Sequence, residues 1–257
     1  MTTTSKGALI STIYDRLLID DDTEESVSGS DFHLAAILAL YDVLLRYAQR
    51  TIRHWYVTAE VMVLVDVPDR TRNPWTPMPD VYVVLDTPDI PRTSLDTRVE
   101  GQSFPQFICE VASESAWGED VGEKRRLYAD LGTREYIVFD PTAQFLHEHI
   151  RAWRRAHDGS WEVWAPTGDG FLDSGVLGLR LRVEGTLLRV YDPVEGLLPT
   201  GRELDELVRE RAAQLVESER VAREQAIQLA ESERVAREQA ARIAKLEARL
   251  APPQRDQ

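Results

Sequence analysis

Residues 107–139, FICEVASESAWGEDVGEKRRLYADLGTREYIVF, decide the fold because two short apolar runs flank a longer stretch with helical spacing. Phe107–Ala112 and Tyr136–Phe139 are almost wholly apolar, which is typical of strands covered on both faces. The stretch between them carries one apolar face, formed by Val121, Leu127, Tyr128 and Leu131. We therefore expect two core strands with a helix between them.

The ends of this helix and the elements before it are also marked in the sequence. Ser113 or Ser115 can cap the helix start, and Gly132 stands where a helix commonly stops. Upstream, alternation over 57–67 predicts a strand that ends at Pro68, and Val81–Leu85 is a third apolar run. An amphipathic helix with Asp31 as its cap precedes them, with apolar positions Leu34, Ile37, Leu38, Tyr41, Leu44, Leu45 and Ala48.

Downstream of Pro141 the pattern changes to hairpins. One turn is predicted at His157–Ser160 and another at Glu184-Gly185, each between apolar residues. Together with the upstream elements, this predicts an α/β (α+β) fold with a mixed central sheet flanked by helices.

A long helix is predicted from Arg202, because Gly and aromatic residues are absent up to Pro252. The decapeptide ESERVAREQA occurs at 217–226 and again at 231–240, a period of two heptads. One heptad column is apolar (Val208, Leu215, Ala222, Leu229, Ala236, Ile243, Leu250), and the column four residues later alternates Ala with Glu. Such a seam fits a weak coiled coil that joins protomers, or a solvated single helix held by Glu–Arg pairs.

These patterns divide the chain into four parts. We expect an acidic N-terminal segment over 1–30, a globular domain over 31–200, a helical coiled-coil tail over 202–251 and a disordered end over 252–257. No apolar run is long enough to span a membrane, and the start lacks the basic and apolar regions of a signal peptide, which predicts a cytoplasmic protein. The single cysteine, Cys109, excludes a disulfide framework and a multi-cysteine zinc site within one chain.

The charge argues against indiscriminate binding to nucleic acid. Among 257 residues, 30 Lys and Arg face 44 Asp and Glu, which gives a net charge of -14. Residues 202–257 contribute only -1, whereas residues 1–35 contribute -5. A constitutive DNA-binding protein usually has a broad basic surface. Any nucleic-acid contact is therefore expected to be confined to small basic groups, here Lys124, Arg125 and Arg126 with Arg151, Arg154 and Arg155.

Three charged residues lie where the predicted core meets its edge: Asp80 before one strand, Glu110 within the next, and Lys124 on the following helix. A carboxylate among apolar strand residues needs a partner, because burying it alone is costly. Asp80 and Glu110 can converge on Mg²⁺, with Mn²⁺ as the alternative ion and the Val111 carbonyl as a third oxygen ligand. Lys124 would then orient the attacking water or neutralise charge on a phosphodiester.

Structural roles compete with this interpretation. Asp80 and Glu110 can serve packing alone, and Asp120 with Lys124 is also an ordinary i,i+4 pair. Three tryptophans, Trp153, Trp161 and Trp164, gather around the first hairpin, where cross-strand packing competes with stacking on bases. No Gly-rich phosphate loop and no nucleophile elbow is present.

The combined string MPDVYVVL, FICEVASES and EDVGEKRRLYADLGTREYIVFDP resembles the Uma-two family of restriction-endonuclease-like proteins, a branch of the PD-(D/E)XK nuclease superfamily. The resemblance covers about residues 30 to 195. It matches the family motifs at Pro79-Asp80, Glu110–Ser113, Asp120, Lys124, Tyr128, Gly132, Glu135-Tyr136 and Asp140-Pro141. It implies catalytic roles for Asp80, Glu110 and Lys124.

The chain also departs from the pattern of the superfamily. The lysine normally lies two residues after the Glu, where this chain has Ala112, and Lys124 matches the position to which this family moves it. The aromatic residue after Glu-Tyr is Ile137 here. His33 falls at the family's histidine position, where contact with the site and a capping or surface role both remain open. Glu60 is either a third acid near the metal or a solvent-facing strand residue.

Three hypotheses follow for the function. The first is a Mg²⁺-dependent endodeoxyribonuclease that assembles as a homo-oligomer, a dimer, through its tail. The second is a catalytically silent nuclease-fold scaffold or binding protein assembled through the coiled coil, which the acidic body favours. The third is a nuclease for RNA or for branched or damaged DNA.

Overall fold

The computed structural model describes residues 30–65, 76–99 and 103–250. Apart from Ser30, the predicted N-terminal segment lies outside these residues, and so does the predicted end at 252–257. The chain divides into two compact units, Met1–Glu203 and Leu204–Gln257.

The first unit is organised around a six-stranded sheet in the order β1-β3-β5-β6-β7-β8. Its strands are β1 Trp55–Ala59, β3 Val81–Leu85, β5 Phe107–Val111, β6 Glu135–Phe139, β7 Ile150–Arg155 and β8 Trp161–Val163. β5 and β6 run parallel, with Glu110 opposite Val138, and the other neighbours are antiparallel. The predicted mixed sheet and its three apolar runs are therefore confirmed. A separate parallel pair joins β2 Val63–Leu64 to β4 Leu95–Asp96.

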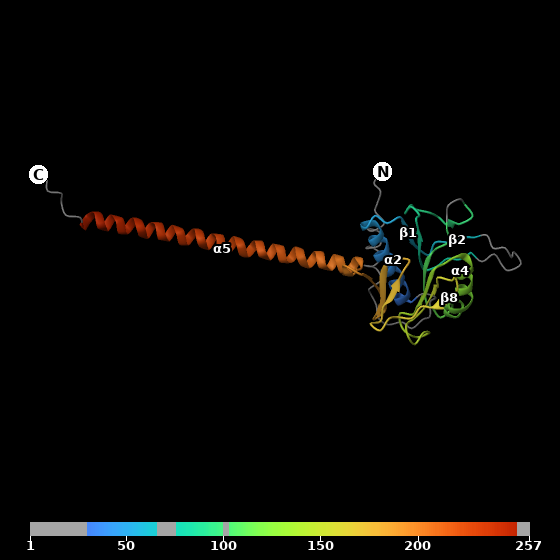
Figure 1. Cartoon of the computed structure of the whole chain (residues 1–257). Coiled ribbons are helices and arrows are strands. Elements are labelled where there is room, and N and C mark those ends of the chain that lie inside the picture. Colours follow the sequence, from blue (N-terminus) through green and yellow to red (C-terminus); the bar gives the residue numbers. More distant parts are fainter. Residues whose placement is uncertain (1–29, 66–75, 100–102, 251–257) are drawn as a thin grey trace. The chain divides into compact units, whose positions relative to one another are not determined.

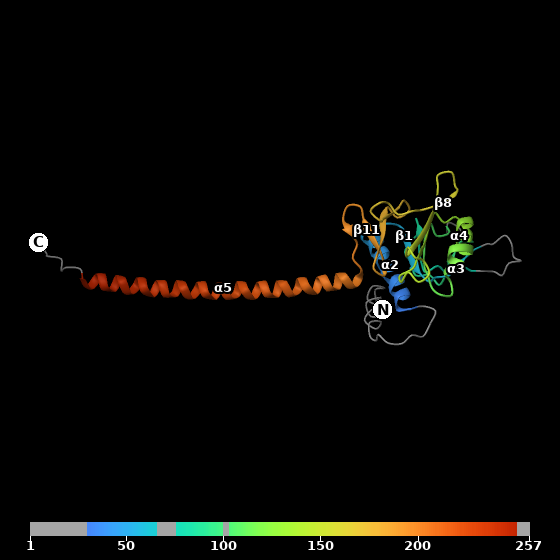
Figure 2. The same ribbon diagram turned by 90° about the horizontal axis from the view of Figure 1, so that it is seen from below.

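Helix α2, Asp31–Arg50, lies between this sheet and a four-stranded sheet (Figures 1 and 2). The second sheet has the order β12-β11-β10-β9 and contains β9 Leu172–Ser174, β10 Leu179–Glu184, β11 Leu187–Asp192 and β12 Gly196–Leu197. The opposite face of the large sheet is covered by α3 Trp117–Glu119, the π segment η1 Asp120–Lys124 and α4 Arg125–Leu131. The core therefore consists of two apolar clusters, one on each face of the large sheet.

Strand alternation distributes the side chains between these two clusters. In β5, Phe107, Cys109 and Val111 pack in the cluster around α2, whereas Ile108 packs in the cluster around α4. Because successive side chains point to opposite faces, Glu110 lies on the same face as Ile108. The strand thus directs one carboxylate towards η1 and α4.

The predicted strand over 57–67 is interrupted after Ala59. Glu60 has a left-handed backbone with φ of 52°, and its N–H donates to the carbonyls of Pro79 and Asp80 at 3.1 and 3.2 Å. The chain bends there and resumes as β2, while Asp66 and Val67 lie outside the described residues. The prediction of one continuous strand is therefore wrong.

Two helix starts also differ from the sequence prediction. Ser30, not Asp31, caps α2, because its side chain accepts the His33 N–H at 3.3 Å. The single helix predicted after β5 consists of α3, η1 and α4, and it begins after Ala116 without a side-chain cap from Ser113 or Ser115. The Ser113 carbonyl, rather than its hydroxyl, accepts the Trp117 N–H at 3.1 Å.

The turn residues agree with their predictions. Gly132 ends α4 in the left-handed region with φ of 104°, a conformation that favours glycine. The β7–β8 and β10–β11 hairpins form as predicted, with positive φ at Gly159 and Gly185.

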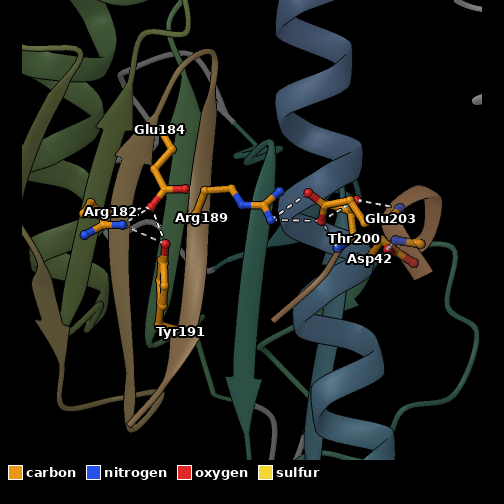
Figure 3. A network of polar contacts seen from close by, with 8 residues as sticks. Asp42, Arg182, Glu184, Arg189, Tyr191, Thr200 and Glu203 are labelled. Atoms are coloured by element: carbon orange, nitrogen blue, oxygen red, sulfur yellow. Dashed lines mark hydrogen bonds and ion pairs between the residues drawn. The ribbon is translucent and has the colours of Figure 1, made fainter. Parts of the chain in front are cut away.

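Helix α5, Gly201–Leu250, begins at an N-terminal cap made by several side chains (Figure 3). The Thr200 N–H donates to Glu203 at 2.7 Å, and the Glu203 N–H donates to the Thr200 hydroxyl at 3.4 Å, which is a capping box. Two buried residues hold this turn: Asp42 of α2 accepts the Gly201 N–H at 2.8 Å, and Arg189 of β11 pairs with Glu203 at 2.8 Å. From Asp205 to Leu246 every side chain of α5 is exposed in the single chain.

Candidate functional site

Asp80 and Glu110 meet where β3 begins and β5 ends. The Asp80 backbone N–H donates to Glu110 Oε2 at 3.1 Å, and the Val111 N–H donates to Asp80 Oδ2 at 2.7 Å. This reciprocal contact follows from the antiparallel register, which sets Val81 opposite Cys109. The two carboxylates predicted from the sequence therefore lie side by side at one edge of the sheet.

The second carboxylate oxygen of Glu110 is contacted from the helical layer. Tyr128 donates its hydroxyl to Glu110 Oε1 at 2.6 Å, and the Lys124 ammonium lies 3.3 Å from the same oxygen. Lys124 also pairs with Asp120 at 2.6 Å. Asp120 and Glu110 are each 1% exposed, so the Asp120–Lys124 contact is not the surface ion pair that its i,i+4 spacing alone suggests. With Asp80, the result is a polar cluster of three carboxyl groups, one ammonium and one phenol.

The π segment gives this cluster its geometry. η1 places Asp120 and Lys124 on a turn wider than that of an α-helix, and α4 continues it to Tyr128. Tyr136 of β6 donates its hydroxyl to the Asp120 carbonyl at 2.9 Å. This contact ties the irregular turn to the sheet, so that three side chains spaced four residues apart all reach the same cluster.

Burial dominates the ionisation of the cluster. It raises the pKa of Asp80 to about 8, with the Glu110 carboxylate as the next cause, and raises the pKa of Asp120 to about 6. Burial lowers the pKa of Lys124, but the carboxylates of Glu110 and Asp120 outweigh it and hold that pKa above its ordinary value. Burial also raises the pKa of Tyr128, which keeps its hydroxyl a donor. Lys124 therefore remains a cation among three carboxyl groups.

His33 and Glu60 lie at the margin of the cluster. His33, at the start of α2, is half-buried beside Ala112, and its Nδ1 is buried without a hydrogen-bond partner in the described part of the chain. Burial lowers the pKa of His33, while Glu60 and Glu110 act in the opposite direction. Glu60 is exposed and follows β1, so it is not a strand residue. The capping contact of His33 is made by its backbone N–H, and the charges of Glu60, Glu110 and Lys124 act on its ring.

The donor set fits a small hard cation. Asp80, Glu110 and Asp120 carry three carboxyl groups against one ammonium, an excess of acid that an apolar environment disfavours. Within residues 30–65, 76–99 and 103–250, no three His, Cys, Asp or Glu side chains form a cluster that could hold a metal ion by themselves. Two carboxylates supplemented by water are what Mg²⁺ requires, whereas Zn²⁺ and Ca²⁺ usually need more protein ligands.

The predicted aromatic and basic groups are used mainly for packing. Trp153 and Trp164 are buried, and Trp153 stacks on Tyr136 with 5.9 Å between ring centroids. Among the basic side chains, Arg155 donates to the Ala129 carbonyl and Arg154 pairs with Glu162. Arg125 lies 5.3 Å above the Trp153 ring. Arg126, Arg151 and Arg154 are exposed, and Arg154 is the one of these three that pairs with Glu162.

The pair of Trp117 and Phe145 near the site was not predicted from the sequence. Trp117, three residues before Asp120, stacks on Phe145 with 6.3 Å between centroids and 16° between planes. Phe145 is positioned because the buried Asp140 accepts its backbone N–H. In the sequence, the family motif Asp140-Pro141 marks the acceptor of this contact, but nothing marks its partner. Trp117 remains 40% exposed.

The comparison with protein families decides the affiliation of this chain. A family profile described as "Uma2: Putative restriction endonuclease" matches residues 14–183. The chain belongs to the Uma2 family. The Uma2 match includes Asp80, Glu110, Asp120, Lys124 and Tyr128, and it ends before α5.

Other comparisons add little to the Uma2 assignment. A solved structure titled as a putative nuclease belonging to DUF820 from Anabaena variabilis ATCC 29413 is similar, with a TM-score of 0.42 and 12% identity. The similarity covers 62% of this chain and 78% of that one. No curated protein matches. None of the described helices combines the length and apolar character needed to cross a bilayer.

Proposed function

We propose that this Uma2 protein is a Mg²⁺-dependent endonuclease that hydrolyses DNA phosphodiester bonds, with Mn²⁺ as an alternative ion. The observation that carries the proposal is the contact of Asp80 with Glu110 and Val111, at 3.1 and 2.7 Å, beside the Lys124 ammonium. Two carboxylates and a cationic side chain at one sheet edge match the requirements of metal-assisted hydrolysis. Family membership supports the same reaction class.

Asp80 and Glu110 are the proposed ligands of the ion, with the Val111 carbonyl as the third protein oxygen. When bound, Mg²⁺ stabilises charge on the phosphate and lowers the pKa of a coordinated water. Hydrogen bonds from the chain orient both carboxylates. The Val111 N–H donates to the Asp80 carboxylate, and the Tyr128 hydroxyl donates to that of Glu110. Both carboxylates are thereby held close together before an ion arrives, which limits reorganisation on binding.

Lys124 is the proposed catalytic cation. Its ammonium lies 2.6 Å from Asp120 and 3.3 Å from Glu110, so it is held at the carboxylates by two charged contacts. From this place it can orient an attacking water or neutralise charge that develops on the phosphodiester. Asp120 is a positioning residue, because it acts through Lys124. His33 and Glu60 border the site and are proposed to contribute only to its local charge.

The proposal also covers the contacts with DNA and the assembly of the chain. Arg126 and Arg151, which are exposed, are the proposed phosphate contacts, and a net charge of -14 restricts binding to such small groups. We further propose that α5 joins two copies of the chain, because Leu215, Leu229 and Ile243 form an exposed apolar column. Location in the cytoplasm stays a prediction.

Nicking of supercoiled plasmid DNA by the purified full chain tests the proposal. We expect cleavage with Mg²⁺ or Mn²⁺, none with EDTA, and a loss of at least about 100-fold in Asp80→Asn and in Lys124→Met, the range for removing one catalytic group. Asp173→Asn is the matched control, because Asp173 is exposed and its charged partner among the described residues is Arg180. Its activity should equal that of the wild type.

Two results would contradict the proposal. The first is no cleavage of supercoiled, linear or single-stranded DNA with either ion by a protein whose tryptophan fluorescence and circular dichroism show that it is folded. The second is cleavage that Asp80→Asn and Lys124→Met leave unchanged, which would indicate a contaminating nuclease. Cleavage of RNA alone would replace DNA as the substrate.

A further inference from the structure

We propose that α5 pairs with α5 of a second copy in the antiparallel direction, with Ala226 of one chain beside Leu229 of the other. The inference rests on the proposed self-association of α5 and is independent of the nuclease proposal. It assigns the direction and the register of the pairing, which an apolar heptad column alone leaves open.

The seam of α5 consists of the two heptad columns that would face a partner helix. It contains leucine or isoleucine, glutamate and alanine in a fixed order. From Ala212 to Ile243, the seam positions are Ala212, Leu215, Glu219, Ala222, Ala226, Leu229, Glu233, Ala236, Ala240 and Ile243. The order Leu, Glu, Ala, Ala repeats every 14 residues, because both the decapeptide ESERVAREQA and the leucine two residues before it repeat. The large members are exposed in the single chain, with Leu215 at 56%, Leu229 at 63% and Ile243 at 56%.

Parallel pairing in register is unfavourable for this order. It places every seam residue against its own copy, so Glu219 faces Glu219 and Glu233 faces Glu233 in the interior of the pair. Like charges in such layers are destabilising. It also sets Ala against Ala between layers of Leu against Leu, which leaves the helices too far apart to pack at the alanines.

Antiparallel pairing about a point between Ile227 and Gln228 removes both conflicts. Between Ala212 and Ile243, each large seam side chain then meets an alanine, and each seam glutamate meets an alanine. The five distinct layers are Ala212 with Ile243, Leu215 with Ala240, Glu219 with Ala236, Ala222 with Glu233, and Ala226 with Leu229. Since each layer combines a small residue with a longer one, the distance between the helices can stay constant along 32 residues.

The charges are complementary in the same register. The alanine opposite each seam glutamate is followed by an arginine, so that Arg237 of the second copy lies beside Glu219 and Arg223 of the second copy beside Glu233. Arg237 already reaches along its own helix to Glu233 at 3.1 Å, which shows that its guanidinium can cover the seam side of the helix. Each seam glutamate thereby gains a cation from the opposite chain.

The 14-residue repeat also discriminates between registers. A shift by seven residues sets Leu215 against Glu233 and Leu229 against Glu219, which buries charge against apolar side chains. A shift by 14 residues restores the size pattern but shortens the paired segment. The register centred between Ile227 and Gln228 keeps the largest number of favourable layers.

Distances between nitroxide spin labels on the full chain test the direction. Ala213 and Gln228 lie outside the seam, and the native Cys109 is fully buried, so a thiol reagent labels the introduced cysteine in Ala213→Cys or Gln228→Cys. In the proposed pair, the two labels at 213 are separated by about 44 Å along the helix, from a rise of 1.5 Å per residue. Parallel pairing keeps them within about 20 Å, because paired helices lie 8–10 Å apart.

The control label at 228 is expected to give a distance below about 25 Å in either direction, because this residue lies next to the pairing centre. A short distance at both positions overturns the antiparallel inference. A monomeric mass in analytical ultracentrifugation overturns it together with self-association. The plasmid nicking assay decides the nuclease proposal separately, since it is read from different residues.

Discussion

Replacing Tyr128 by Phe removes one oxygen atom from the buried contact with Glu110, and Tyr136→Phe removes the same atom from a neutral contact. Both side chains are fully buried, and both rings stay in place through their mutual edge-to-face contact at 5.3 Å. Tyr128 donates to a carboxylate, whereas Tyr136 donates to the Asp120 backbone carbonyl. The pair therefore compares a charged with a neutral hydrogen bond at constant ring volume.

The expected cost follows from the acceptors. A hydrogen bond to a charged group contributes about 1.5–3 kcal/mol and a neutral one about 0.5–1.5 kcal/mol. We therefore expect Tyr128→Phe to lower the free energy of unfolding by about 1 kcal/mol more than Tyr136→Phe. With a urea dependence of about 2 kcal/mol/M, this is an additional decrease of about 0.5 M in the unfolding midpoint.

Urea unfolding followed by tryptophan fluorescence, without divalent ions, measures the difference. All six tryptophans lie between residues 55 and 164, so the signal reports the first unit and not α5. Equal midpoints for the two variants would refute the reasoning, because they would mean that the hydrogen bond from Tyr128 to Glu110 contributes no more to stability than the neutral one.

Three further changes have expected outcomes. Asp42→Ala removes the acceptor of the Gly201 N–H and should cost about 1–3 kcal/mol in urea unfolding, whereas Asp42→Asn keeps an acceptor and should cost less. Burial raises the pKa of Glu135 above its ordinary 4.5, so its contribution to stability is complete below that pH and is lost as the pH rises through the folded pKa. Glu135→Gln should therefore gain stability relative to the wild type as the pH rises above 4.5, and a difference in unfolding free energy that stays constant with pH would contradict this. Gly132→Ala should lower the melting temperature by the equivalent of about 1 kcal/mol because φ is 104°, while Gly122→Ala, with open space and no positive φ, should be neutral or stabilising.

The core strands and the two carboxylates could be predicted because their signals are local. Val81–Leu85 and Phe107–Val111 are continuous apolar runs, and a carboxylate within such a run, Glu110, requires a partner. Lys124 was a weaker case, since composition and spacing describe only an i,i+4 pair with Asp120. Its place on the helix after Glu110 suggested the catalytic role and the family motif agrees with it, and the contact with Glu110 adds a physical reason.

The features that the sequence did not predict depend on contacts between distant segments. The bend at Glu60 is stabilised by carbonyls of Pro79 and Asp80, about 20 residues later. The π segment is held by the Tyr136 hydroxyl, which reaches Asp120 across the layer. Helix periodicity cannot reveal either contact, because the partner residue contributes one hydrogen bond and no repeating pattern. The cap of α2 was missed for another reason, since Ser30 and Asp31 are adjacent and equally suited.

The cap of α5 affects how fast the backbone amides at the start of this helix exchange with solvent, compared with the amides farther along it. The Gly201 amide is bonded to Asp42 of α2, so it is released only when that corner of the first unit opens. Amides in the exposed part of α5, beyond Asp205, are released by local fraying of the helix. Amide hydrogen exchange should therefore show slow exchange at Gly201 that matches the α2 core, followed within two turns by much faster exchange. The first turn of α5 behaves as part of the folded body, although the chain continues through it without a break in helical structure.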